Sequence, residues 1–119
     1  MNKSWNVLSW NVRGINSESK LLALRNAIDT SGCSVLCIQE TKRESFDLAF
    51  IKTFCPKCFD KFVFAPSVGA SGGIIIIWNS SVFMGTPWYV DSFAVGVSFV
   101  VTQSNDSWKL INVYGPCSG

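Results

Sequence analysis

The sequence of 119 residues contains no histidine and few charged side chains. Without histidine, no imidazole is available to bind zinc or to accept a proton near neutral pH. Charged residues make up 15% of the chain, against about 25% in typical soluble domains. The net charge of +2 is small and no block of like charge occurs, so composition alone gives no basic patch for nucleic acid. With 48% apolar residues, this balance favours a piece of a larger domain over a small free-standing one.

Long hydrophobic runs are also missing. The longest apolar stretch is GGIIIIW at 72–78, far below the roughly 18 residues that a membrane-spanning helix needs. Near the N-terminus, asparagine and tryptophan interrupt the apolar residues before the core of a signal peptide could form. We therefore expect an intracellular protein, nuclear or cytoplasmic, that is not secreted and has no membrane partner.

The cysteine pattern gives little support to a redox or zinc function. Five cysteines are an odd number, and in a reducing compartment we expect free thiols. Cys55 and Cys58 have C-x-x-C spacing, but a thioredoxin-like pair needs a helix start, and the segment FDKFVF that follows is strand-like. A zinc site needs four ligands, and no second suitable pair exists. We interpret the cysteines as ordinary thiols.

The first forty residues predict a strand, a helix and a second strand. Residues 4–12 (SWNVLSWNV) are typical of a strand. Apolar residues recur at helical spacing over 20–30, and Ser17 or Ser19 is positioned to cap that helix. Residues 34–39 (SVLCIQ) are almost wholly apolar, as in a strand buried on both faces of a parallel sheet. The pattern predicts a βαβ unit.

The remainder predicts one more helix, over 44–54, and then an antiparallel meander. Its strand-rich segments are 61–66, 72–79, 87–103 and 107–115. We expect a single α/β domain spanning 1–119, with a mixed sheet and both helices on one face. The other face should be lined by Ile74, Ile76, Val97 and Phe99 or their neighbours, and no segment of the chain is left to cover it.

Two polar residues end the predicted parallel strands. Glu40 follows 34–39 and Asn11 ends the first strand, and ligands of open α/β sheets bind at the carboxyl ends of strands. A carboxylate there suits Mg²⁺, which takes one or two carboxylates plus water and phosphate oxygens. Considered alone, Glu40 is consistent with a solvated residue at the start of a loop. Asn11 is likewise consistent with a turn residue, and Tyr114 with an aromatic residue of the core. The glycine-rich VGASGG lacks the ending of a phosphate-binding P-loop.

The order of four motifs is more specific than any one of them. WNVRGIN (10–16), IQETK (38–42), SGGIIIIWN (71–79) and NVYGP (112–116) follow one another along the chain. In this order they resemble the endonuclease/exonuclease/phosphatase superfamily and its exonuclease III-like branch. The wording is most similar to the endonuclease domain of plant LINE-type non-LTR retrotransposons.

The resemblance implies Mg²⁺- or Mn²⁺-dependent cleavage of DNA phosphodiesters on a four-layer α/β sandwich. It implies that Glu40 is the metal ligand and that Asn11 belongs to the phosphate and metal pocket. Tyr114 would orient or stabilise the scissile phosphate, and Lys42 would favour the anionic backbone. The Ser-Gly-Gly stretch of the family, a candidate for close approach to DNA, is matched by Ser71, Gly72 and Gly73.

The family pattern continues beyond its tyrosine-containing strand with an Asp and an Asn, another metal-site Asp, and an Asp–His pair. None has a counterpart here. General-base catalysis is worth roughly 10²–10⁴ in rate, so we expect a chain that is inactive alone. The expectation is the N-terminal half of the sandwich, with its second sheet missing, from a retroelement protein that continues into a reverse transcriptase.

Two alternatives stay open. The chain could be one half of an active nuclease that another segment completes, or a non-catalytic binding or interaction fragment. The uncovered apolar sheet face predicts self-association in either case.

Overall fold

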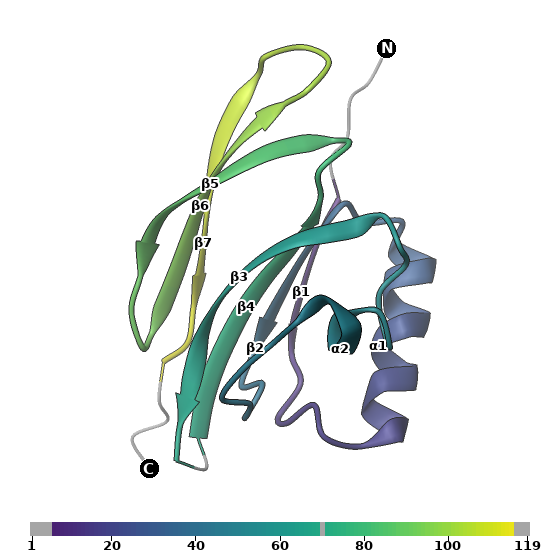
Figure 1. Ribbon diagram of the computed structural model, residues 1–119, viewed down its shortest axis with the longest axis vertical. Helices are drawn as coiled ribbons and strands as arrows, with labels where there is room; N and C mark the ends of the chain where they lie inside the picture. The colour runs from purple at the N-terminus through teal and green to yellow at the C-terminus, as the bar shows by residue number, and fades with distance from the viewer. Residues whose placement is uncertain (1–5, 70, 116–119) are drawn as a thin grey trace.

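Two β-sheets pack face to face, and two helices cover the outer side of the larger sheet (Figure 1). The computed structural model describes residues 6–69 and 71–115. Along the chain the elements are β1 (Val7–Asn11), α1 (Glu18–Ser31), β2 (Val35–Gln39), α2 (Leu48–Ile51), β3 (Phe59–Val68), β4 (Ser71–Asn79), β5 (Phe83–Val90), β6 (Ala94–Val101) and β7 (Ser107–Val113).

The larger sheet has the strand order β1-β2-β4-β3 and is mixed. Strand β1 runs parallel to β2, with Val7 opposite Val35, whereas β4 is antiparallel to both β2 and β3. The first three elements therefore form the predicted βαβ unit. In β2, Val35, Leu36, Cys37 and Ile38 are all buried, as expected for a strand covered on both faces.

Helix α1 begins and ends where its sequence signals lie. Ser17 caps it by accepting a hydrogen bond from the Lys20 N–H, with an Oγ–N distance of 3.3 Å. Gly32 ends it in the left-handed conformation, at φ 62°. Leu24 and Ile28 are buried against the sheet. The predicted helix over 20–30 is confirmed, with its bounds slightly wider.

Helix α2 is much shorter than the predicted 44–54. Asp47 accepts a hydrogen bond from the Phe50 N–H at 2.8 Å and so starts the helix late. The Phe54 N–H then bonds the Ile51 carbonyl, a tight turn in which the regular helix ends. Phe54 is nonetheless fully buried, so the segment still covers the sheet.

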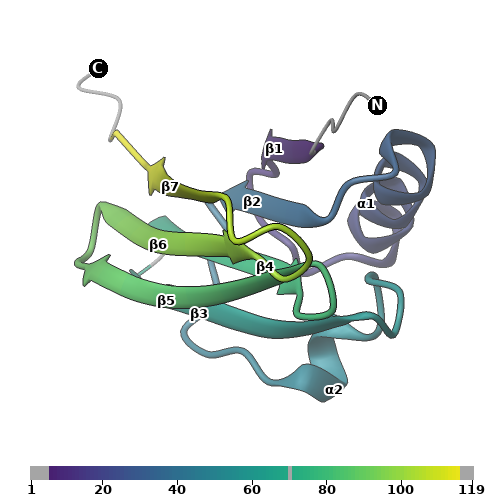
Figure 2. The same ribbon diagram turned by 90° about the horizontal axis from the view of Figure 1, so that it is seen from above.

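The expectation of an uncovered sheet face was wrong. Strands β5, β6 and β7 form a separate antiparallel sheet that packs over β2, β3 and β4 (Figure 2). Ile74 and Ile76 of the first sheet and Val97 and Phe99 of the second are each 0% exposed. Two apolar sheet faces bury each other more completely than one long meander could, which favours a sandwich.

The α/β class, the mixed sheet and the two helices on one face are confirmed, and the architecture is a partial α/β sandwich. Its second sheet is present with three strands, rather than missing. Within the described residues, no helix is long and apolar enough to cross a membrane.

The core between the sheets generates a stability prediction. Phe99 packs against Trp78, with ring centroids 5.4 Å apart, and against Phe83 at 5.4 Å. We expect Phe99→Ala to lower the free energy of unfolding by about 3–5 kcal/mol because it leaves a cavity. Met84, which is 66% exposed, is the control, and Met84→Ala should change the free energy of unfolding by less than about 0.5 kcal/mol. Equal urea midpoints for the two variants would show that this sheet face is not a packed core.

Candidate functional site

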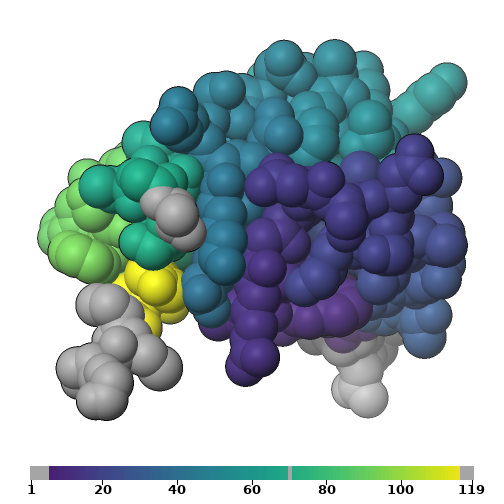
Figure 3. Space-filling model, turned by 90° about the horizontal axis from the view of Figure 1, so that it is seen from below, coloured from purple at the N-terminus to yellow at the C-terminus, as the bar shows by residue number. Residues whose placement is uncertain are grey.

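Four segments that are distant in sequence meet at one end of the sandwich. Strands β1 and β2 are parallel and both end there, with Asn11 opposite Gln39. Strand β4 runs the other way and begins there, and the chain leaving β7 reaches the same end (Figure 1). Viewed from that end, these segments adjoin on one face (Figure 3). We call this end of the molecule the rim.

The backbones that follow β1 and β2 are joined by hydrogen bonds. The Gly14 N–H bonds the Glu40 carbonyl at 2.7 Å, and the Ile15 N–H bonds the Thr41 carbonyl at 3.2 Å. These bonds extend the β1–β2 pairing beyond the regular strands. The backbone of Glu40, the predicted metal ligand, is therefore fixed although it follows the last strand residue.

The start of β4 is joined to the same loop. The Thr41 N–H bonds the Gly73 carbonyl, and the Lys42 N–H bonds the Gly72 carbonyl, both at 2.9 Å. The motifs IQETK and SGG thus form one continuous backbone layer at the rim. Of the predicted DNA-contacting residues, Lys42 and Ser71 are exposed, and Gly72 and Gly73 are buried.

The two glycines are explained by close packing. Gly73 has φ 91°, and a Cβ there would lie 2.2 Å from Thr41 Oγ1. Gly72 has φ 78°, and a Cβ there would lie 3.7 Å from the Tyr114 ring. Both positions require a left-handed backbone, which only glycine adopts freely, and position 73 also has no room for a side chain.

Three residues of the rim hold a left-handed backbone without being glycine. Arg13 has φ 52°, Glu40 φ 53° and Lys42 φ 55°. Such a conformation costs of order 1–3 kcal/mol per residue and persists only where the surroundings impose it. Here the hydrogen bonds between the loops impose it. Concentration of this strain around Glu40 and Lys42 is typical of functional sites.

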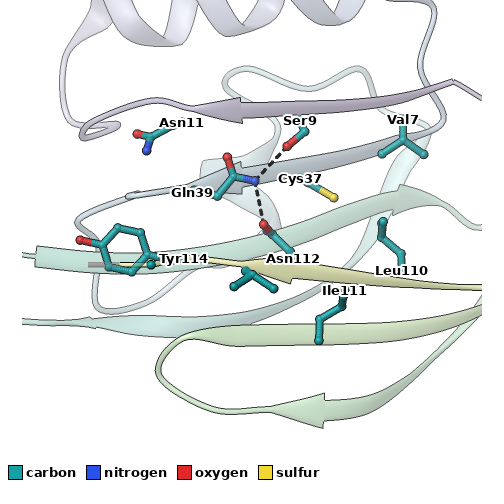
Figure 4. Close-up of a pocket in the computed structure, with 11 residues that line it drawn as sticks. Val7, Ser9, Asn11, Cys37, Gln39, Leu110, Ile111, Asn112 and Tyr114 are labelled. Atoms are coloured by element: carbon teal, nitrogen blue, oxygen red, sulfur yellow. Dashed lines mark hydrogen bonds between the residues drawn. The ribbon is translucent and has the colours of Figure 1, made fainter. Parts of the chain in front are cut away.

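Tyr114 is held from two sides. Its N–H bonds the Phe93 carbonyl at 2.8 Å, and its ring lies next to Gly72. The side chain is partly buried, and no described residue forms a hydrogen bond with its hydroxyl. Figure 4 shows the hydroxyl directed toward the end of the sheet where Asn11 lies. Such a hydroxyl is available to donate to a ligand.

Asn11 and Tyr114 line one cavity of about 380 Å³ between β1, β2 and β7. The cavity exists because the second sheet does not extend over β1, which leaves Val7, Ser9 and Asn11 exposed on that side. Asn11 Oδ1 accepts a hydrogen bond from the Arg13 N–H at 3.2 Å. Glu40 does not line this cavity and lies on the loop directly beyond Gln39.

Sequence reasoning missed the residue that ties the two sheets together beneath the rim. Asn112 of β7 is 3% exposed, and its amide donates to the carbonyls of Ile38 at 3.2 Å and Ile75 at 3.0 Å. Gln39 Nε2 donates to Asn112 Oδ1 at 2.7 Å and to Ser9 Oγ at 3.0 Å (Figure 4). The sequence signal for this role of Asn112 is a polar residue at a strand position that faces inward.

The donor set at the rim suits a hard cation only in part. Glu40 is partly buried, and its carboxylate forms no hydrogen bond or ion pair with any described residue. Within 6–69 and 71–115, no group of three or more acidic, cysteine or histidine side chains is placed to hold a metal ion. One carboxylate and one amide oxygen are compatible with Mg²⁺, which keeps waters and takes substrate oxygens as further ligands.

The C-x-x-C segment lies away from the rim and lacks the environment of a reactive thiol pair. Strand β3 begins at Phe59, directly after Cys58, so no helix N-terminus follows. Cys55 is buried, and burial raises the pKa of its thiol. Burial also raises the pKa of Cys37 to about 12. Raised values disfavour the thiolate that redox chemistry and metal binding require.

Comparison with solved structures finds the same fold. The chain is similar to the AP endonuclease LMAP from Leishmania major, with a TM-score of 0.75 and 18% identity, covering 97% of this chain and 41% of that one. It is also similar to the catalytic domain of APE2 from Xenopus laevis, with a TM-score of 0.58 and 19% identity, covering 92% and 45%. No protein-family profile and no curated sequence matches the chain.

At these identities the likeness shows the fold alone, which the chain shares with these two structures. The chain spans less than half the length of either structure.

The Asn112 bridge generates a prediction. Asn112→Leu keeps the number and branching of the side-chain heavy atoms but removes the hydrogen bonds to Ile38, Ile75 and Gln39, so we expect a loss of about 1–3 kcal/mol in unfolding free energy. Asn26→Leu, at an exposed position of α1, is the matched control and should shift it by less than about 0.5 kcal/mol. Urea denaturation measures both. Indistinguishable midpoints would mean that the bridge contributes nothing to the association of the sheets.

Proposed function

We propose that the rim is part of the active site of a metal-dependent phosphodiesterase that acts on DNA, of the endonuclease/exonuclease/phosphatase type. The observation that carries the proposal is the meeting at one rim of Asn11, Glu40 and Tyr114, from three separate segments. Each side chain lies at a strand end, where ligands of open α/β sheets bind.

Glu40 and Asn11 are the residues that would hold Mg²⁺ or Mn²⁺. The carboxylate of Glu40 has no partner among the described residues, and Asn11 lines the neighbouring cavity, with its amide oxygen also accepting from the Arg13 N–H. When bound, the cation would neutralise charge that builds up on the phosphate as the bond is cleaved.

Tyr114 and Lys42 would act on the phosphate itself. The Tyr114 hydroxyl donates a hydrogen bond to a non-bridging phosphate oxygen, and its fixed backbone keeps that donor in place. Lys42 is exposed on the same loop as Glu40 and attracts the anionic backbone. Ser71 lies on the surface for contact with DNA, while the buried Gly72 and Gly73 hold the backbone beside it through their bonds to Lys42 and Thr41.

We further propose that residues 1–119 are a partial domain of an intracellular retroelement endonuclease, related to plant LINE proteins that continue into a reverse transcriptase. The four motifs in order support this, as does the share of the solved structures that the chain covers. The sequence has no histidine to serve as general base. Alone it is therefore inactive, and catalysis needs residues supplied from another segment.

The metal site is tested by Mn²⁺ binding, measured by electron paramagnetic resonance. We expect Glu40→Gln to weaken Mn²⁺ binding by about 10- to 100-fold, at least as much as loss of a supporting residue does in known sites. Glu44→Gln, an exposed glutamate four residues further along, is the matched control and should bind as wild type does. Equal binding by wild type and both variants would refute the site.

The same variants address activity. In a plasmid-nicking assay with Mg²⁺, we expect neither wild type nor Glu40→Gln to nick above background. Nicking by wild type that Glu40→Gln abolishes would refute the inactivity of the chain while supporting the site.

We also propose that the chain self-associates, through the outer face of the second sheet rather than the inner face expected from the sequence. Three apolar side chains are exposed there on neighbouring strands, namely Trp88, Ile111 and Val113 at 47%, 49% and 57%. A contiguous apolar surface favours association. Light scattering should give a mass above the monomer that falls toward it in Ile111→Lys. A monomer mass at all concentrations would contradict the proposal.

A further inference from the structure

A second cavity lies beside the candidate site, on the other side of Tyr114. Its volume is about 360 Å³, within the usual range of small-ligand sites. It lies between the adjoining ends of β3 and β4, where Ser71 is already proposed to contact DNA, and the β5–β6 turn, which the proposed phosphodiesterase site does not use. Its lining residues are Val68, Ser71, Gly72, Ser92, Phe93 and Tyr114.

Phe93 is an exposed aromatic side chain on a rigid support. It is 53% exposed, although phenylalanine normally buries its ring. Its N–H bonds Asp91 Oδ1 at 2.7 Å, and its carbonyl accepts the Tyr114 N–H at 2.8 Å. Asp91 also accepts from the Ala94 N–H at 2.8 Å and from the Tyr89 hydroxyl. These hydrogen bonds therefore fix the backbone of the turn that carries Phe93 next to Tyr114.

Tyr114 is the common wall of the two cavities. It lines the cavity that contains Asn11 as well as the cavity that contains Phe93. A ligand that extends past this side chain would place an anionic group near the hydroxyl and an adjoining group against Phe93. A nucleotide has this construction, because its charged phosphate is linked through a sugar to a flat base with apolar faces.

We propose that the Phe93 cavity binds an unstacked base of single-stranded DNA, the base belonging to a nucleotide next to the phosphate held at Tyr114. The inference rests on the proposed function of the rim. Phe93 supplies the stacking surface, which every base can use, and the serine hydroxyls of Ser71 and Ser92 supply hydrogen bonds to base edges. The apolar side of the cavity is completed by Val68, which is 68% exposed.

The mixed lining favours a base over an apolar peptide side chain. Of the six lining residues, Ser71, Ser92 and Tyr114 carry hydroxyl groups. Ser71 Oγ donates to the Val68 carbonyl at 3.4 Å, whereas an apolar occupant would give the Ser92 hydroxyl no partner. A base offers both a flat face for the ring and polar edges for the hydroxyls. The continuity with Tyr114 also fits an occupant that carries an anion.

The test is binding of a fluorescein-labelled oligothymidylate to the 119-residue chain with Mg²⁺, measured by fluorescence anisotropy. We expect Phe93→Ala to weaken binding by about tenfold, within the roughly 5- to 150-fold that loss of one base–aromatic stack produces. Phe93→Trp should bind at least as tightly as wild type because it restores a stacking surface. Leu22→Ala is the control, since Leu22 is 58% exposed on α1, outside the cavity and outside the proposed self-association surface.

A second probe separates stacking from general contact. In an oligonucleotide of the same length whose nucleotides carry no bases, the phosphates remain, so wild type and Phe93→Ala should bind it equally. Equal losses for Phe93→Ala with both probes would overturn the proposal, as would an equal loss for Leu22→Ala. A failure of the proposed phosphodiesterase site at the rim would give a different binding result. Binding that does not respond to Glu40→Gln or Tyr114→Phe would refute the phosphodiesterase site, whereas Glu40-dependent binding that is unchanged in Phe93→Ala would refute only the base site.

Discussion

The contact between the two sheets is the constraint on which the candidate site depends. Apolar side chains supply most of its free energy, but they do not fix how far one sheet slides over the other. Asn112 does, because its amide must reach two carbonyls on adjacent strands at once. Gln39 of β2 adds a third hydrogen bond, which it donates to Asn112 Oδ1. In this bridge, Gln39 immediately precedes Glu40, and Asn112 lies two residues before Tyr114. The same contact therefore positions both site residues.

Above this bridge, the rim stores strain and offsets it with backbone hydrogen bonds. Arg13, Glu40 and Lys42 hold left-handed conformations that cost of order 1–3 kcal/mol each. The bonds from Gly14 to Glu40 and from Lys42 to Gly72 hold these conformations in place. A loop whose backbone was not held in these conformations could adopt others. The rim instead presents a carboxylate and a lysine in fixed positions, as an electrostatically preorganised site requires.

Much of the first half could be predicted because its signals are local. Helical periodicity, a serine cap and an unbroken apolar strand gave the βαβ unit, and the rule for strand ends placed Glu40 and Asn11 at one edge. In the second half, strands were predicted at 61–66, 72–79 and 107–115, where β3, β4 and β7 lie, but their division into two sheets was not, for a non-local reason. Alternating strands such as the one containing Val97 and Phe99 have the same pattern whether they extend a sheet or cover it. The sequence shows that these side chains are buried without showing against what. Phe93 lay inside a predicted strand, whereas it belongs to a turn that only the hydrogen bonds of Asp91 reveal.

The register of β7 connects the bridge to the chemistry. In a strand, alternate residues face the same side, so Asn112 and Tyr114 both point toward the first sheet together with Leu110. A slip of one residue would turn all three outward and bury Ile111 and Val113 in their place. The slip would also turn Trp108 away from Phe99, whose ring centroid lies 4.7 Å from that of Trp108, and would place Lys109 between the sheets. The loss of the hydrogen bonds that Asn112 makes with Ile38 and Ile75 opposes it further. An asparagine is therefore more useful here than a leucine, because it costs some apolar burial but specifies which face of the strand, and so which tyrosine orientation, the sandwich adopts.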